Sequence, residues 1–138
     1  MDYKDILKSI VAVGGSLVTY LLGGWSTLIQ ILVAFVVIDY VTGVLAAASE
    51  GKLNSEIGMK GIAKKVFIFI FVALGNLADT ALDMQGNLLR NAVIYFYLAN
   101  ELLSIIENAG RMGIPVPGIL EKAVEIFNSK SENTNTPG

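Results

Sequence analysis

The sequence predicts an all-α integral membrane protein, a bundle of four transmembrane helices (three possible) followed by a short C-terminal amphipathic helix. Of its 138 residues, 54% are hydrophobic and only 16% are charged, whereas soluble domains carry about 25% charged residues. No charged side chain occurs from Ser9 to Ile38. Because lipid offers the backbone no hydrogen bonds, segments that span it must be helical.

Four apolar segments are candidates for the spans. If helical, the uncharged run from Ser9 to Ile38 measures about 45 Å and exceeds the roughly 30 Å hydrocarbon core of a bilayer. Gly23–Gly24 supplies the break that this length requires. The short polar loop 83–87 makes the last two spans a tight hairpin. The predicted spans are about 6–22, 25–48, 62–82 and 88–108.

The basic residues predict the orientation, because Lys and Arg collect on the cytoplasmic side. With four spans and a cytoplasmic N-terminus, only Arg90 of the basic residues lies outside, and both termini are cytoplasmic. The first segment is the weakest span, since it is short and contains Gly14–Gly15, Ser16 and Thr19. If it lay flat on the membrane instead, Lys4 and Lys8 would be outside.

The C-terminal region predicts one further helix. Pro115 and Pro117 end the fourth helix, and residues 119–128 form an amphipathic stretch. This stretch is expected either on the inner membrane surface or on a neighbouring subunit. Residues 1–128 are therefore expected to form a single helical membrane domain, and 129–138 a disordered polar tail.

Three carboxylates fall within the spans, at Asp39, Asp79 and Glu101. A charged residue at the bilayer centre costs about 2.5–3.5 kcal/mol, so these groups should be protonated, paired or facing water. Asp39 and Glu101 both lie about 14–15 Å above the inner boundary and are expected to meet near the midplane. Asp79 lies further out, where it either reaches the headgroups or contacts Arg90 in the assembled state.

The fourth span carries a polar face. Tyr97, Glu101, Ser104 and Asn108 recur at helical spacing, and Asn100 flanks them. Small residues beside polar ones let membrane helices approach closely, as at Gly43 after Asp39 and Gly75 before Asp79. The candidates for pore formation or oligomerisation are Asp39, Gly43, Gly75, Asp79, Arg90, Tyr97, Asn100, Glu101, Ser104 and Asn108.

The composition argues against catalysis. The chain contains neither Cys nor His, which removes thiol nucleophiles, imidazole bases and the metal sites built from them. We therefore expect no catalytic, cofactor or metal site and no enzyme. The net charge of −2 argues against nucleic acid as a partner.

Three separated motifs resemble the toxin-secretion/phage-lysis holin family. They are DYVTGVLAA at residues 39–47, SEIGMKGIAKK at 55–65 and NELLSIIENAGRMGIPVP at 100–117. The likeness covers about residues 5–127, and its specificity lies in the order and spacing of the motifs together.

The resemblance implies a bacteriophage holin in the bacterial cytoplasmic membrane. Such a protein would oligomerise with copies of itself in the lipid bilayer and form a nonspecific pore for host cell lysis or toxin secretion. Its functional partner would be an endolysin or a toxin, without necessary direct binding. The next Met after Met1 is Met59, so no second start for an inhibitor lies near the first, and any antiholin would be a separate protein and a further partner. The alternatives are a small multi-span transporter and a quiet regulatory membrane subunit such as an antiholin.

Overall fold

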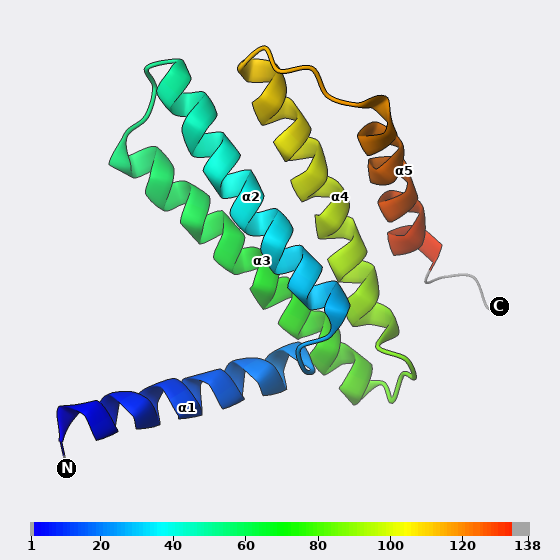
Figure 1. Ribbon diagram of the computed structural model, residues 1–138. Helices are drawn as coiled ribbons and strands as arrows, with labels where there is room; N and C mark the ends of the chain where they lie inside the picture. The colour runs from blue at the N-terminus through cyan, green and yellow to red at the C-terminus, as the bar shows by residue number, and fades with distance from the viewer. Residues whose placement is uncertain (1, 134–138) are drawn as a thin grey trace.

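Five α-helices and no strand make up residues 2–133, which the computed structural model describes (Figure 1). The all-helical prediction is thus confirmed. By length and composition, two of the helices, α1 and α2, are apolar enough to cross a membrane. The helices are α1 (Tyr3–Leu22), α2 (Thr27–Ser49), α3 (Ser55–Ala81), α4 (Leu88–Arg111) and α5 (Gly118–Glu132).

Polar side chains cap the starts of α2 and α3. The Ser26 hydroxyl accepts a hydrogen bond from the Ile29 N–H (3.3 Å), and Asn54 Oδ1 accepts one from the Ile57 N–H (2.8 Å); both satisfy otherwise unpaired donors of the first turn. The Asn54 cap starts α3 at Ser55 rather than at about 62. The helix therefore extends seven residues beyond the N-terminal end of the predicted span.

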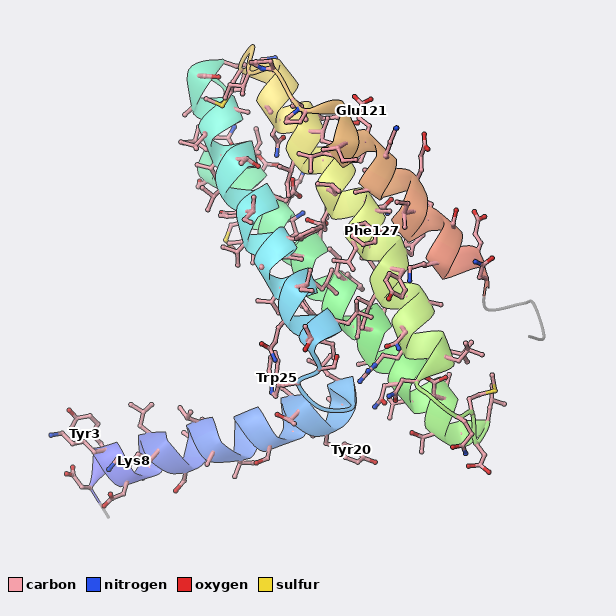
Figure 2. All side chains as sticks on the ribbon, turned by 45° about the vertical axis from the view of Figure 1, so that its right-hand side comes forward. Tyr3, Lys8, Tyr20, Trp25, Glu121 and Phe127 are labelled. Carbon is pink, nitrogen blue, oxygen red and sulfur yellow. The ribbon has the colours of Figure 1, made fainter. Side chains whose placement is uncertain are left out.

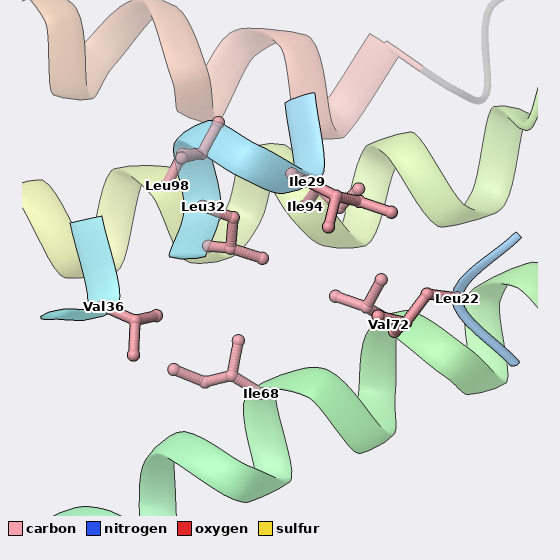
Figure 3. Close-up of a cluster of buried hydrophobic side chains, with 8 residues drawn as sticks. All are labelled: Leu22, Ile29, Leu32, Val36, Ile68, Val72, Ile94 and Leu98. Carbon is pink, nitrogen blue, oxygen red and sulfur yellow. The ribbon is translucent and has the colours of Figure 1, made fainter. Parts of the chain in front are cut away.

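The core lies where α2, α3 and α4 meet (Figure 3). α4 is the central helix, because α2, α3 and α5 all pack along it, whereas α2 and α3 touch one another only sparsely. One cluster of buried side chains joins the three long helices and the end of α1: Leu22, Ile29, Leu32, Val36, Ile68, Val72, Ile94 and Leu98.

α1 leaves this bundle at a wide angle, and only its C-terminal end meets the rest of the molecule (Figures 1 and 2). Buried side chains fix that end. Asn76 Nδ2 donates to the carbonyls of Tyr20 (3.3 Å) and Leu21 (3.0 Å), and Arg90 Nη1 to those of Leu22 (3.2 Å) and Gly23 (3.0 Å). We call this junction the elbow. Within one copy, α1 is therefore not the fourth member of the predicted bundle.

α5 packs along α4 of its own chain instead of standing alone (Figure 1). The Phe127 ring centroid lies 6.2 Å from that of Phe35 and 6.2 Å from that of Tyr95. Lys130 Nζ lies 5.4 Å from the Tyr95 ring centroid, and Val124 is buried. Of the apolar residues in the amphipathic stretch, Ala123 and Phe127 pack on the bundle beside Val124, whereas Ile119 and Ile126 are exposed.

The helix is also longer than 119–128, since it ends at Glu132. Part of the predicted polar tail is therefore helical. Residues 134–138 of that tail lie outside the described residues.

Replacement of Gly75 tests the close approach of α3 and α4. A Cβ at this position would lie 3.0 Å from Arg90 Cα and 3.2 Å from Arg90 N. Because these are backbone atoms, Gly75→Ala should lower the free energy of unfolding by about 1–3 kcal/mol, measured by denaturant titration in detergent micelles. Gly110→Ala is the control, since Gly110 is exposed and no described atom lies within 4 Å of its Cβ position. Equal stability of the two variants would contradict the packing.

Candidate functional site

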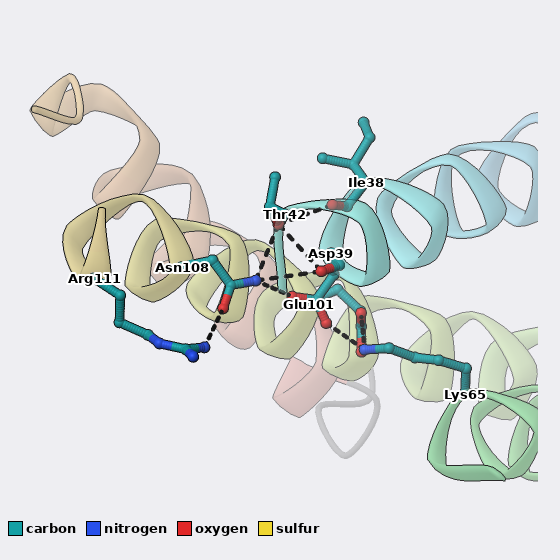
Figure 4. Close-up of polar contacts among 7 residues, drawn as sticks. All are labelled: Ile38, Asp39, Thr42, Lys65, Glu101, Asn108 and Arg111. Atoms are coloured by element: carbon teal, nitrogen blue, oxygen red, sulfur yellow. Dashed lines mark hydrogen bonds and ion pairs between the residues drawn. The ribbon is translucent and has the colours of Figure 1, made fainter. Parts of the chain in front are cut away.

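An ion cluster joins the three long helices inside the bundle (Figure 4). Lys65 Nζ on α3 contacts Asp39 Oδ2 on α2 and lies 2.6 Å from Glu101 Oε2 on α4. The carboxylate side chains are only 6% and 7% exposed, and the Lys65 side chain is 20% exposed. Each long helix therefore contributes one charge to a single buried contact.

Asn108 extends this ion cluster by one helical turn. Its Nδ2 donates to Asp39 Oδ1 (3.0 Å), to the Asp39 carbonyl (3.2 Å) and to Thr42 Oγ1 (3.0 Å). A Cβ at Gly43 would lie 3.6 Å from Asn108 Nδ2, an ordinary van der Waals distance, so the contact with Asn108 does not require glycine at this position. No buried side-chain polar atom of the described residues lacks a hydrogen-bond partner.

The charges of the cluster do not balance if all three groups are ionised, because one cation then faces two carboxylates. Breaking a buried ion pair by removing one partner costs about 3–5 kcal/mol. The arrangement is therefore most sensitive to loss of the shared cation. Loss of either carboxylate charge leaves a one-to-one pair.

A cavity of about 420 Å³ leads to this cluster from the end of the bundle where α2 ends and α3 begins. We call it the vestibule. Asp39, Lys65 and Ser104 lie among its lining residues, with Lys60 and Lys64 nearer the mouth. Apolar residues such as Val44, Leu53 and Ile57 make up much of the remaining lining.

Arg111 and Glu50 clamp the same end of the bundle. Arg111 Nε donates to Glu50 Oε1 (2.9 Å) and Nη2 to Oε2 (3.2 Å). These hydrogen bonds hold the pKa of Glu50 below its usual value and raise the pKa of Arg111. The clamp ties the end of α2 to the end of α4 beside the vestibule.

A second polar group lies at the opposite end. The Asp79 carboxylate accepts the backbone N–H groups of Leu89 (2.8 Å) and Arg90 (2.9 Å). It thus caps α4, where a negative charge is favourable. Within one copy, Asp79 contacts Arg90 through this backbone N–H, while the guanidinium binds the carbonyls at the elbow.

The candidate residues identified from the sequence fall mainly into two groups, one at each end of the bundle. Asp39, Gly43, Glu101, Ser104 and Asn108 gather around the ion cluster and the vestibule. Gly75, Asp79 and Arg90 lie at the elbow end. Tyr97 stands between the groups and stacks on Phe71 at 6.4 Å, and Asn100 is exposed on α4.

Lys65 is the residue that sequence reasoning missed, because it was counted among the cytoplasmic charges. α3 starts at Ser55, so Lys65 lies about 15 Å inside the helix. A signal was present in the spacing. Lys65, Ile68, Val72, Gly75 and Asp79 recur at intervals of three and four, which places Lys65 on the face that α3 buries.

Comparison with known proteins gives one family and several relatives. Residues 16–129 match the sequence model of the bacteriophage holin family. An uncharacterised protein of Halalkalibacterium halodurans is 47% identical over 90% of this chain and 95% of its own. One of Listeria monocytogenes is 47% identical over 91% and 89%. A probable holin of Bacillus phage phi105 is 32% identical over 75% and 76%. No solved structure matches.

Lys65→Met tests the shared cation, because it leaves two buried carboxylates with no positive partner. The variant should lose about 3–5 kcal/mol of unfolding free energy in micelles. Lys64→Met is the matched control, since Lys64 is exposed and should cost little. Asp39→Asn and Glu101→Gln should each cost less than Lys65→Met. If either one destabilised the protein as much as Lys65→Met, the shared-cation arrangement would be wrong.

Proposed function

Because the chain belongs to the bacteriophage holin family, we propose that it is a holin that oligomerises in the bacterial cytoplasmic membrane and opens a nonspecific lesion. The lesion releases a cell-wall hydrolase for host lysis, or a large toxin. Family membership points to a non-enzymatic membrane protein, in agreement with the absence of Cys and His from the chain.

The observation that carries this proposal is that the molecule has two unlike sides. Large apolar side chains are exposed along α1, α2 and α3. On α5 the exposed surface adds charges to apolar residues: Glu121, Lys122 and Glu125 are exposed beside Ile119 and Ile126. Figure 2 shows Glu121 on the outer side of this helix. Since Phe127 of α5 packs between Phe35 and Tyr95, these charges lie beside the middle of the bundle, not beyond its end.

Placed in a bilayer, the two sides require different surroundings. The apolar side is suited to lipid, but each charge facing lipid at the centre costs about 2.5–3.5 kcal/mol. In a ring of copies with α5 on the inside, each of these charges faces water. The same ring keeps the apolar faces of α2 and α3 in lipid, so it encloses a water-filled opening.

This arrangement also accounts for a dependence on protein density. An isolated copy has no water column for its α5 side to face, and the charged side becomes favourable only when enough copies enclose one. The ion cluster keeps each three-helix unit intact during this change. We place the N-terminus and the loop 50–54 in the cytoplasm, with four spans per chain, because this leaves Arg90 as the only basic residue on the outer side.

Expression in a bacterium with a membrane-potential dye tests the function. We expect an abrupt loss of potential at a threshold level of protein, and lysis only when a cell-wall hydrolase is also present. Glu125→Leu should delay or abolish the loss without preventing membrane insertion, because it removes a charge from the water-facing side.

Glu56→Leu is the control, since it removes the same charge from the exposed start of α3. It should leave the timing unchanged. Saturable, substrate-specific flux would instead identify a transporter, and insertion that never collapses the potential would identify a quiet regulatory subunit. Either result would overturn the proposal.

Labelling of single introduced cysteines tests the proposed topology. The chain has no cysteine of its own, so there is no background labelling. In intact cells before the potential collapses, a membrane-impermeant thiol reagent should label Thr27→Cys and Gln85→Cys. It should label Asp2→Cys and Lys52→Cys only after the cells are permeabilised. Labelling of Asp2→Cys from outside would place α1 on the outer surface and exclude four spans.

A further inference from the structure

An open apolar groove runs between α2 and α3. It consists of two adjoining hollows of about 450 and 280 Å³, which share Val36, Val37, Val66 and Phe69 as lining residues. We call it the α2–α3 groove. Its lining comes from α2, α3, Trp25 and the end of α1, while α4 packs on the other faces of the two helices.

Apart from its C-terminal end, α1 is an apolar helix with no neighbouring helix in the described structure. Along its length Ile10, Val13 and Leu17 are 63%, 69% and 56% exposed. Gly14 and Gly15 lie mid-helix with no described atom within 4 Å of either Cβ position. A glycine there costs about 1 kcal/mol relative to alanine, whereas small residues are what lets membrane helices pack closely. Contacts within one copy do not explain the glycine pair.

The α1 helix of the same copy is a poor occupant for the groove, because the elbow holds it away. Folding α1 back would break the hydrogen bonds from Asn76 and Arg90 to the last carbonyls of α1. Asn76 and Arg90 are only 9% and 3% exposed. Leaving such buried groups unsatisfied costs about 1–3 kcal/mol each.

We propose that α1 of one copy packs in the α2–α3 groove of a second copy, and that the exchange is reciprocal. In each copy α1, which we call the arm, and the three-helix bundle diverge from the elbow at a wide angle (Figures 1 and 2). A two-fold axis along the membrane normal then brings the arm of each copy beside the bundle of the other, with both elbows at the same depth. A two-fold swap of one element is a low-cost route to a dimer.

The dimensions and the charges agree with this occupant. α1 has 20 residues, or about 30 Å, and the groove follows α2 from Trp25 to Val41, or about 24 Å. The arm then runs parallel to α3, so Asp2 and Asp5, which alternate with Lys4 and Lys8, reach the end where Lys60 and Lys64 are exposed beside Glu56. Exposed ion pairs of this kind contribute about 0–1 kcal/mol and therefore select direction more than affinity.

The exchange deepens the proposed holin function, on which it rests, by naming the first assembly step. It uses the α1, α2 and α3 surfaces and leaves the charged side of α5 free. The swapped dimer is accordingly the unit that higher assembly would bring around water.

Disulfide formation between two separately tagged copies tests the exchange in membranes. The register of the elbow places Ala12 level with Val37, and Val11 level with Val66. Ala12→Cys in one copy should crosslink to Val37→Cys in the other, and Val11→Cys to Val66→Cys. Each yield should exceed that of Ala12→Cys with Phe96→Cys by about tenfold, because a disulfide requires Cα atoms within about 7 Å and Phe96 is exposed on α4.

Equal crosslinking to Phe96→Cys would indicate random collision and overturn the exchange. So would the absence of both predicted crosslinks, which would leave lipid as the neighbour of α1. A chain carrying both Ala12→Cys and Val37→Cys that closed only within itself would show that its own α1 fills the groove. The readout is independent of lysis, so a crosslinked dimer that never collapses the membrane potential would contradict the holin proposal and not the exchange.

Discussion

Lys65 is the cation on which two buried carboxylates depend, and the arrangement of the bundle follows from this dependence. Asp39, Lys65 and Glu101 come from three different helices, so no helix can leave without stranding a charge. In lipid a charge that loses its partner cannot be hydrated instead. The cluster therefore fixes the rotation of α2, α3 and α4 about their axes. It also makes α4 the helix against which both others pack.

Once these rotations are fixed, the outer surfaces are fixed as well. α2 and α3 turn their polar residues to α4, which leaves apolar side chains on the outside and an apolar groove between them. The other face of α4 packs against α5, whose exposed surface carries Glu121, Lys122 and Glu125 beside two apolar residues. One buried contact thus produces a molecule with a lipid side and a water side, which is the property that a pore-forming subunit needs.

The sequence was a good guide wherever the relevant spacing was local. Matched depths along two helices placed Asp39 near Glu101, and helical periodicity placed Asn108 on the same face. Lys65 was missed because the start of α3 depends on the Asn54 cap, and hydropathy alone does not reveal a cap. The direction of α1 could not be predicted from the sequence, because it depends on hydrogen bonds from Asn76 and Arg90 to carbonyls more than 50 positions away.

The central claim is that α5 stays beside α4 when the lesion opens, with its charged side facing water. Cysteines introduced at Ala99 and Val124, which share one buried cluster, would tie the two helices together by a disulfide. Release of an entrapped dye from vesicles containing the tied protein tests the claim most directly. The account predicts the same release before and after the disulfide is reduced. Release that begins only on reduction would contradict it, because α5 would then have to leave α4 for the lesion to open.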